Sequence, residues 1–174
     1  MGGNYIEELI SEYYKLRGYF VMNNYWFPFQ SKRQRTVKGK IQKYLARSWT
    51  DIDVIAINSK ELLLIQVKTS INRENIIDGI KKFFKRVDAY LETGLARDNE
   101  SDIKWWMNGR KIKKMVIFEH CTNKYKLILE EACIEAKSIS EFIDEIIEYV
   151  KDNKGVKEDN PMIRFLHYIY KLRK

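Results

Sequence analysis

The sequence has few of the residues that build zinc sites. Its two cysteines, Cys121 and Cys133, lack CxxC spacing, and its two histidines are His120 and His167. Zinc sites normally use cysteine and histidine at short, fixed spacings, so we expect none here. His120 and Cys121 are adjacent, and neighbouring residues on a strand point to opposite faces, which argues against a histidine-activated cysteine nucleophile.

Long apolar runs are also missing. No stretch approaches the roughly 18 to 20 apolar residues that span a bilayer as a helix, and no basic start precedes an apolar signal region. We find no internal repeat, no low-complexity tract and no GxxxxGK[ST] phosphate loop. We therefore expect a soluble, cytoplasmic protein without a membrane partner. Its 174 residues, 45% of them hydrophobic, suffice for one compact domain.

Acidic residues are absent from one long segment. Residues 13–50 contain nine bases and no acid, whereas the rest of the chain holds 23 bases and 24 acids. The net charge of +8 therefore comes from this segment. Seven of its bases are interleaved with Tyr44 and Trp49, which is typical of a surface that binds a phosphate backbone. They are Lys32, Arg33, Arg35, Lys38, Lys40, Lys43 and Arg47.

The form of this basic segment is open to two interpretations. Arg33 and Arg35 alternate as on one face of a strand, and Gly39 would allow the segment to bend as a flexible arm. The alternative is a solvated loop that is basic for solubility. Its position directly before the strand discussed next favours a role in binding nucleic acid.

Residues 51–70 predict a β-hairpin. Two strand-like runs, 52–57 and 62–67, flank the letters NSKE, which favour a tight reversal. If residues 59 and 60 form the loop, residue 58 pairs with residue 61. The register along both strands follows from that pairing.

This register brings polar side chains together. It places Asp53 opposite Gln66 and Asp51 opposite Lys68. Alternate residues share a face, and directly opposed Cβ atoms lie roughly 4.5 to 5.5 Å apart. Two oxygen ligands, from Asp53 and Gln66, and the amine of Lys68 should therefore converge.

Such a set suits phosphodiester hydrolysis. A hard divalent cation takes oxygen ligands, here the Asp53 carboxylate and the Gln66 amide oxygen. Lys68 would place a positive charge near the attacking water or the transition state. The alternative is an ordinary hairpin in which Asp51 and Lys68 form a surface ion pair, worth about 0 to 1 kcal/mol.

The segment IDVIAINSKELLLIQVKT resembles the active-site hairpin of the PD-(D/E)XK nuclease superfamily. There, an aspartate on one strand is followed by (D/E/Q)-x-Lys on the next, which matches Asp53 and Gln66-Val67-Lys68. Gln66 departs from the commoner acid and removes one negative charge from the metal site. The resemblance implies a Mg²⁺- or Mn²⁺-dependent nuclease that acts on DNA. Members of similar size include Holliday-junction resolvase-like enzymes and restriction-type endonucleases.

The N-terminal segment extends the resemblance. Apolar residues at 6, 9, 10, 13 and 16 predict a helix that stops at Gly18, followed by an extended aromatic run. In many members of the superfamily, a glutamate on the opening helix approaches the metal site. Glu7 is the preferred match and Glu8 the second choice. An exposed, uninvolved glutamate is the alternative for either.

The downstream pattern completes the predicted fold. Apolar spacing over 76–91 predicts a helix that ends near Gly94, and residues 115–118 predict a further strand. The rest predicts three helices, the last capped by Asn160, with a short extended link at 134–138 and a capping box at Ser138 and Glu141. We expect an α/β fold with a restriction endonuclease-like core of order αβββαβ around a mixed sheet, with the site at the edge of the sheet. The core would occupy residues 1–120, and residues 121–174 would complete the same domain with helices.

The functional prediction is a metal-dependent DNA endonuclease with Glu7, Asp53, Gln66 and Lys68 as its site. A homodimer would suit the cutting of two strands. Two other classes stay open: a module of the same fold that binds nucleic acid without cutting it, and an interaction protein whose basic segment binds an acidic partner.

Overall fold

The computed structural model describes residues 3–93, residues 106–153 and four helical positions near the C-terminus, namely 161, 164, 165 and 168. Asn160, the expected cap of the last helix, lies outside these residues, as does Gly94, where the 76–91 helix was expected to end. In the described part of the chain, no helix is both long enough and apolar enough to cross a membrane.

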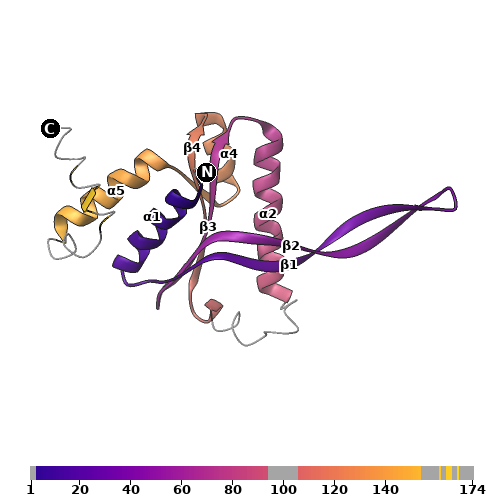
Figure 1. Ribbon diagram of the computed structural model, residues 1–174, viewed down its shortest axis with the longest axis horizontal. Helices are drawn as coiled ribbons and strands as arrows, with labels where there is room; N and C mark the ends of the chain where they lie inside the picture. The colour runs from indigo at the N-terminus through magenta and orange to yellow at the C-terminus, as the bar shows by residue number, and fades with distance from the viewer. Residues whose placement is uncertain (1–2, 94–105, 154–160, 162–163, 166–167, 169–174) are drawn as a thin grey trace.

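Five strands form one mixed sheet in the order β1-β2-β3-β4-β5 (Figure 1). The first three strands are antiparallel neighbours, and β4 and β5 continue the sheet parallel to β3. The strands are β1 (Phe20–Val37), β2 (Lys40–Ile57), β3 (Glu61–Ile71), β4 (Lys111–Cys121) and β5 (Ile134–Ser138).

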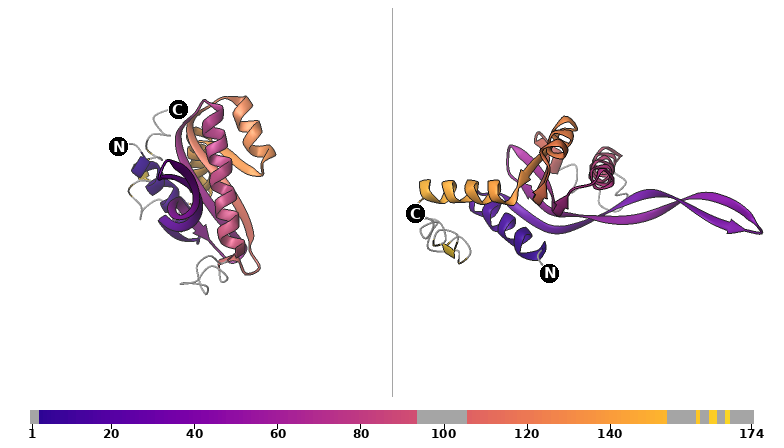
Figure 2. Two further views of the ribbon diagram at one scale, coloured as in Figure 1. Left: turned by 90° about the vertical axis from the view of Figure 1, so that its right-hand side faces the viewer. Right: turned by 90° about the horizontal axis from the view of Figure 1, so that it is seen from above.

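Helices cover both faces of this sheet (Figure 2). One face, which we call the α1 face, carries α1 (Gly3–Leu16) and α5 (Ile139–Asp152). The other, the α2 face, carries α2 (Glu74–Thr93) and α4 (Asn123–Glu131). Each face buries its own apolar cluster against the sheet. The predicted α/β class is confirmed, and the order αβββαβαβα is compatible with a restriction endonuclease-like core.

The helix that opens the chain forms as predicted. Its apolar stripe buries Ile10, Tyr13 and Tyr14 in the cluster of the α1 face. Gly18 then adopts a φ of 80°, a left-handed conformation that costs glycine little. The chain thereby reverses directly into β1.

The C-terminal half contains a strand where the sequence indicated a link. Residues 134–138 were predicted to be extended, but they form β5 and pair in parallel with β4. Residues 121–152 therefore complete the sheet as well as the helical layers. The predicted capping box is confirmed, because the Ser138 hydroxyl accepts from the Glu141 amide at 3.1 Å and the Glu141 carboxylate accepts from the Ser138 amide at 2.7 Å.

The first two strands extend far beyond the rest of the sheet and form a two-stranded arm (Figure 1). We define the arm as residues 30–47, and every side chain from residue 32 to residue 45 is exposed. At its tip Lys38 and Gly39 have φ of 47° and 74°, and Val37 pairs with Lys40. This is the geometry of a two-residue type I′ turn. The basic segment is therefore a regular β-ribbon that reverses at Lys38 and Gly39. The strand-like alternation of Arg33 and Arg35 is confirmed, and the alternative of a solvated loop is wrong.

Candidate active site

The candidate site lies where β2 and β3 separate. Their ladder runs from Ile57 opposite Leu62 to Val54 opposite Ile65, which is the register predicted from the NSKE turn. Beyond Val54, β2 follows β1 into the arm, whereas β3 stays paired with β4. The strands thus form a fork in the interior of the sheet, because β1 and β5 are the edge strands. The expectation of a site at the sheet edge is corrected accordingly.

Side chains bridge the fork in place of ladder pairs. The Val67 amide donates to Asp53 Oδ2 at 2.6 Å, and Gln66 Nε2 donates to the Asp51 carbonyl oxygen at 2.9 Å. Buried backbone groups need partners, and these contacts supply them where the second strand has left. The predicted cross-strand pairs, Asp53 with Gln66 and Asp51 with Lys68, lie beyond the end of the ladder.

Gln66 links this bridge to the lysine. Its side chain is 5% exposed, and its amide oxygen accepts a hydrogen bond from Lys68 Nζ at 2.8 Å. Both ends of the amide are therefore engaged, which fixes its orientation and that of the ammonium group. Lys68 contacts Gln66 in the structure, rather than forming the alternative ion pair with Asp51.

The side-chain alternation of β2 breaks at Asp53. Val54 packs on the α1 face and Ile55 on the α2 face, yet Ile52 packs on the α2 face as well. The neighbouring strand shows the same irregularity opposite Asp53, at Asn24, whose φ is 52°. The kink turns the chain between Ile52 and Val54. The sequence-based prediction assumed regular alternation along β2 and therefore did not include this kink.

Helix α1 brings Glu7 to the fork. Ser11, one turn later, is buried, and its hydroxyl contacts the Glu7 carbonyl oxygen at 2.7 Å and Asn23 Oδ1 at 2.6 Å. This contact ties the helix to β1 beside the kink. Nothing in the sequence pattern distinguished Ser11 or Asn23 from other polar residues. Of the two candidate glutamates, Glu7 is partly buried and Glu8 is exposed.

The carboxylates of the site perturb one another. Burial raises the pKa of Asp53, and this outweighs the Val67 hydrogen bond and the nearby Lys68 charge, which lower it. Burial also raises the pKa of Glu7, and repulsion from Asp53 and Asp51 raises it further, while Lys68 opposes the effect. Glu7 therefore lies within electrostatic reach of the fork. The site concentrates negative charge that a cation would relieve.

The donor set fits a hard divalent cation. Asp53 and Glu7 offer carboxylate oxygens, and Gln66 offers an amide oxygen that Lys68 engages in this structure. Within the described ranges, no three His, Cys, Asp or Glu side chains are grouped so that they could hold an ion. Mg²⁺ commonly binds one or two protein carboxylates and keeps several waters, so it suits this sparse set better than an ion that needs a full protein cage.

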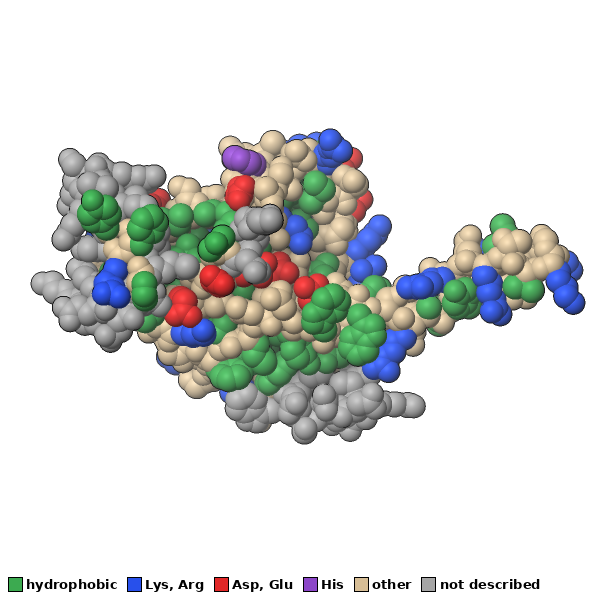
Figure 3. All heavy atoms as spheres, in the orientation of Figure 1, with side chains coloured by type: hydrophobic (Ala, Val, Ile, Leu, Met, Phe, Trp, Pro, Cys, Tyr) green, Lys and Arg blue, Asp and Glu red, His purple; other side chains and the backbone are tan. Residues whose placement is uncertain are grey.

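The arm begins a few residues along β2 from this site. Figure 3 shows acidic side chains gathered near the centre of the face, hydrophobic side chains beside them at the base of the arm, and basic side chains along it. The seven bases predicted to bind nucleic acid all lie on the arm and are exposed. Their grouping on one projecting ribbon was not apparent from the sequence.

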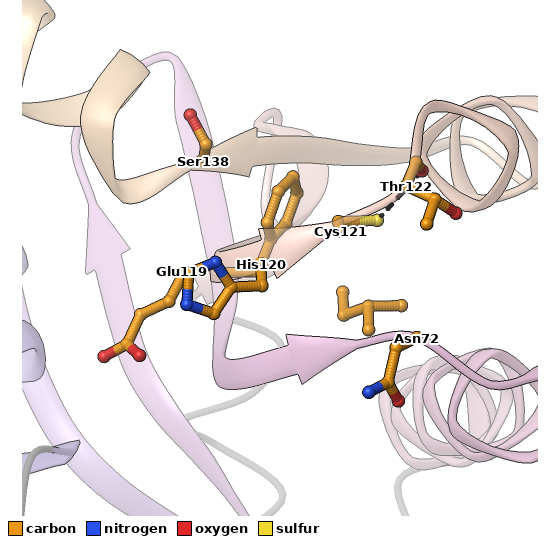
Figure 4. Close-up of a pocket in the computed structure, with 8 residues that line it drawn as sticks. Asn72, Glu119, His120, Cys121, Thr122 and Ser138 are labelled. Carbon is orange, nitrogen blue, oxygen red and sulfur yellow. Dashed lines mark hydrogen bonds between the residues drawn. The ribbon is translucent and has the colours of Figure 1, made fainter.

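A hollow that lies apart from the fork is found at the carboxyl ends of β3, β4 and β5 (Figure 4). It has a volume of about 320 Å³, and residues around His120 and Cys121 line it. The two side chains extend in different directions, and the thiol contacts the carbonyl oxygen of Thr122 at 3.3 Å. Burial raises the pKa of Cys121, which disfavours the reactive thiolate. The expectation that these residues form no nucleophile pair agrees with this arrangement.

Comparison with known proteins adds little to this description. No family model matches the chain, and no curated protein matches it. A solved structure, "Crystal Structure of Protein of Unknown Function AF1548", is similar with a TM-score of 0.44 and 11% sequence identity. The similarity covers 77% of this chain and 56% of that protein. At these values it carries no argument about activity, and the fold assignment rests on the strand order and layers described above.

Proposed function

We propose that this protein is a metal-dependent endonuclease that hydrolyses phosphodiester bonds of DNA. The observation that carries the proposal is the meeting of Glu7, Asp53, Gln66 and Lys68 at the fork of β2 and β3, beside a basic arm. The motif resemblance to the PD-(D/E)XK superfamily supports the same reading, because each motif position falls at this fork.

Asp53 and Gln66 would hold Mg²⁺ or Mn²⁺, with Glu7 as a further ligand either directly or through water. When bound, the ion would neutralise charge on the phosphate and polarise its oxygens. The raised pKa values of Glu7 and Asp53 mean that their ionised forms are disfavoured in the folded protein, and a bound cation would offset this cost.

Lys68 would act on the reacting phosphate through its charge. Its ammonium group is held by the Gln66 amide oxygen at 2.8 Å, so it needs little reorganisation to face an anionic transition state. Gln66 is in turn held by the Asp51 carbonyl oxygen. We therefore assign Gln66 a double task, as a neutral ligand and as the group that orients Lys68.

The shape of the arm favours DNA over double-stranded RNA. The major groove of B-form DNA, about 12 Å wide, admits a two-stranded β-ribbon, whereas that of A-form RNA is deep and too narrow for side chains to read. The eight ladder pairs of the arm span about 24 Å at the usual rise per residue. A homodimer would present two such arms and two sites, one for each strand of a duplex.

The direct test is a cleavage assay. Wild-type protein and the Asp53→Asn and Lys68→Ala variants would be incubated with supercoiled plasmid and with a labelled four-way junction, in Mg²⁺, Mn²⁺ or EDTA. We expect cutting by wild-type protein in either metal, none in EDTA, and a loss of about 10³-fold in rate for each variant.

The matched control is Asp78→Asn, which removes an exposed carboxylate from α2, on the opposite face of the sheet. It should cut at the wild-type rate. Cutting by Asp53→Asn at the wild-type rate would contradict the assignment of the site, and persistence of cutting in EDTA would contradict the role of a metal.

One observation favours a second candidate, a binding module of the same fold that does not cut. Gln66 stands where the motif usually has an acid, and its amide oxygen already accepts from Lys68. Both features weaken metal binding. Tight DNA binding by wild-type and Asp53→Asn protein, without cutting in either metal, would select this candidate.

A further inference from the structure

Two exposed tryptophans stand between the candidate active site and the arm. Trp26 is 58% exposed and Trp49 is 54% exposed. In the ladder, Trp26 lies opposite Asp51, and Trp49 lies opposite Pro28. The tryptophans are therefore diagonal neighbours, with Cβ atoms about 7 to 8 Å apart or less, a spacing that aromatic side chains bridge.

Both tryptophans belong to the face on which Glu7 lies. Phe27 and Ile52 pack on the α2 face, so their strand neighbours Trp26 and Asp51 point to the α1 face. Trp49, two residues from Asp51, shares that orientation. On the other face, the base of the arm is covered, because the Arg86 guanidinium of α2 lies over the Phe29 ring at 4.0 Å.

An exposed indole pair needs an explanation, since tryptophan is usually well buried. The surroundings specify what would cover it. The Arg47 guanidinium lies over the Trp49 ring at 5.0 Å, and residues 30–47 hold seven bases and no acid. Two copies packed through this surface would bring two such basic arms together. A flat, apolar group attached to phosphate satisfies both the rings and the charge.

We propose that Trp26 and Trp49 form a stacking platform for an unpaired base next to the scissile phosphate. In duplex DNA the grooves expose the edges of bases, whereas their faces are occupied by stacking. A base can lie flat on a tryptophan when it has left the helix. The inference rests on the proposed function and narrows it: the preferred substrate is duplex DNA that opens into a single strand at the site.

Binding without cleavage tests this inference. In EDTA, the affinities of wild-type protein for a blunt duplex and for the same duplex with a single-stranded tail would be measured by fluorescence anisotropy. A 2-aminopurine at the first unpaired position of the tail would report stacking by quenching. We expect the tailed duplex to bind about 5- to 100-fold more tightly, which is the range that base–aromatic stacking supplies.

Four variants assign this preference to the rings. Trp26→Ala and Trp49→Ala should lose the tail preference and the quenching while they keep the affinity for blunt duplex. Trp26→Phe and Trp49→Phe retain a stacking surface, so these variants should keep most of the tail preference and most of the quenching. The matched control is Leu45→Ala, which removes an apolar side chain that is 62% exposed and lies farther along the arm; it should leave the preference intact.

The outcomes separate this inference from the nuclease proposal. Equal affinity for blunt and tailed duplexes, or an equal loss of both in the alanine variants, overturns the platform even where the protein cuts DNA. A tail preference that depends on the rings, in a protein that never cuts in Mg²⁺ or Mn²⁺, supports the platform and contradicts the nuclease. Failure to bind any DNA overturns both. A shift to monomer in the alanine variants, with tail preference unchanged, assigns the tryptophans to contacts between copies and also overturns the platform.

Discussion

The two halves of the β1–β2 pair differ in burial and in charge. In the body, residues 20–29 and 48–57 contribute Phe27, Ile52 and Ile55 to the core and carry the two aspartates of the fork. In the arm, residues 30–47 contribute no buried side chain and carry seven bases without an acid. The β1–β2 ladder therefore joins a packed, acidic half to an unpacked, basic half.

The comparison indicates that the arm is not retained for stability. An isolated two-stranded ribbon is marginal in water, and this one is held by its turn, its ladder and a few side-chain contacts, such as Arg35 over Tyr44 at 5.5 Å. Its accumulated charge disfavours compactness and favours a polyanion. Under the proposed function, the arm would contribute to DNA binding and the fork to the chemical step.

Removal of the arm should have the largest effect of the changes considered, and the effect should be on DNA affinity. Replacement of residues 31–46 by Asn-Gly, a favoured type I′ turn, would join Gln30 directly to Arg47, which already face each other. We expect an unchanged thermal midpoint, because no buried side chain is lost. Duplex DNA affinity should fall about 10³-fold, and the slope of log affinity against log salt should become shallower by up to about 5, since six bases are removed.

Circular dichroism and anisotropy titrations over a range of KCl concentrations measure the two quantities. A ribbon of full length in which the same six bases are glutamine is the control for shape. It should bind as weakly as the shortened protein. If it bound like wild type, the affinity would come from the shape of the arm rather than from its charge, and a lower thermal midpoint in the shortened protein would show that the arm supports the body.

A smaller effect is expected in the body, where the buried Asp53 of the fork should lower the free energy of unfolding. Because the folded-state pKa of Asp53 is raised, its stabilising contribution is complete below the ordinary value of 3.8 and is lost as the pH rises through the raised value. At neutral pH the ionised side chain is therefore unfavourable. Asp53→Asn, which keeps an oxygen for the Val67 amide, should raise the thermal midpoint by about 2 to 4 °C at pH 7.

The gain should shrink on acidification and vanish below pH 3.8, where wild-type Asp53 is protonated in both states. Scanning calorimetry at several pH values checks this, with Asp78→Asn as the exposed control. Added Mg²⁺ should raise the midpoint of wild type more than that of Asp53→Asn. A midpoint for Asp53→Asn that lies below wild type at pH 7 would mean that the hydrogen bond to Val67 outweighs burial.

The body was more predictable than the arm for a physical reason. The NSKE turn fixes the register because Asn58 Oδ1 accepts from the amides of Lys60 and Glu61, both at 2.8 Å. These contacts are local, and the apolar runs on either side agree with them. The seven-base arm has no buried face, so no apolar alternation marked 40–51 as strand. Its ribbon follows from the Lys38–Gly39 turn and from continuation of the ladder.

The sequence predicted that the side chains of the candidate site lie close together, but not how they are arranged. The proximity of Asp53, Gln66 and Lys68 was predictable because turn and register are local. The fork was not, since it depends on β2 following β1 rather than β3, and that choice is made by long-range pairing. Long-range pairing also determines β5. Its five residues lie beside β4 in space, but they have no periodic sequence pattern of their own that would predict a strand.

The smallest expected effect comes from a glycine substitution that tests whether the arm and the body unfold together. Gly39 has a φ of 74° with no atom within 4 Å of an added Cβ, so Gly39→Ala introduces backbone strain alone, about 1 kcal/mol. Amide exchange near residues 36–41 should become about fivefold faster, with the thermal midpoint unchanged. Gly79→Ala, in the interior of α2 with equally open space, should instead raise the midpoint slightly, because alanine favours a helix. The same added methyl group thus destabilises the arm locally and stabilises the body. A lower midpoint for Gly39→Ala would show that the arm and the body unfold as one unit.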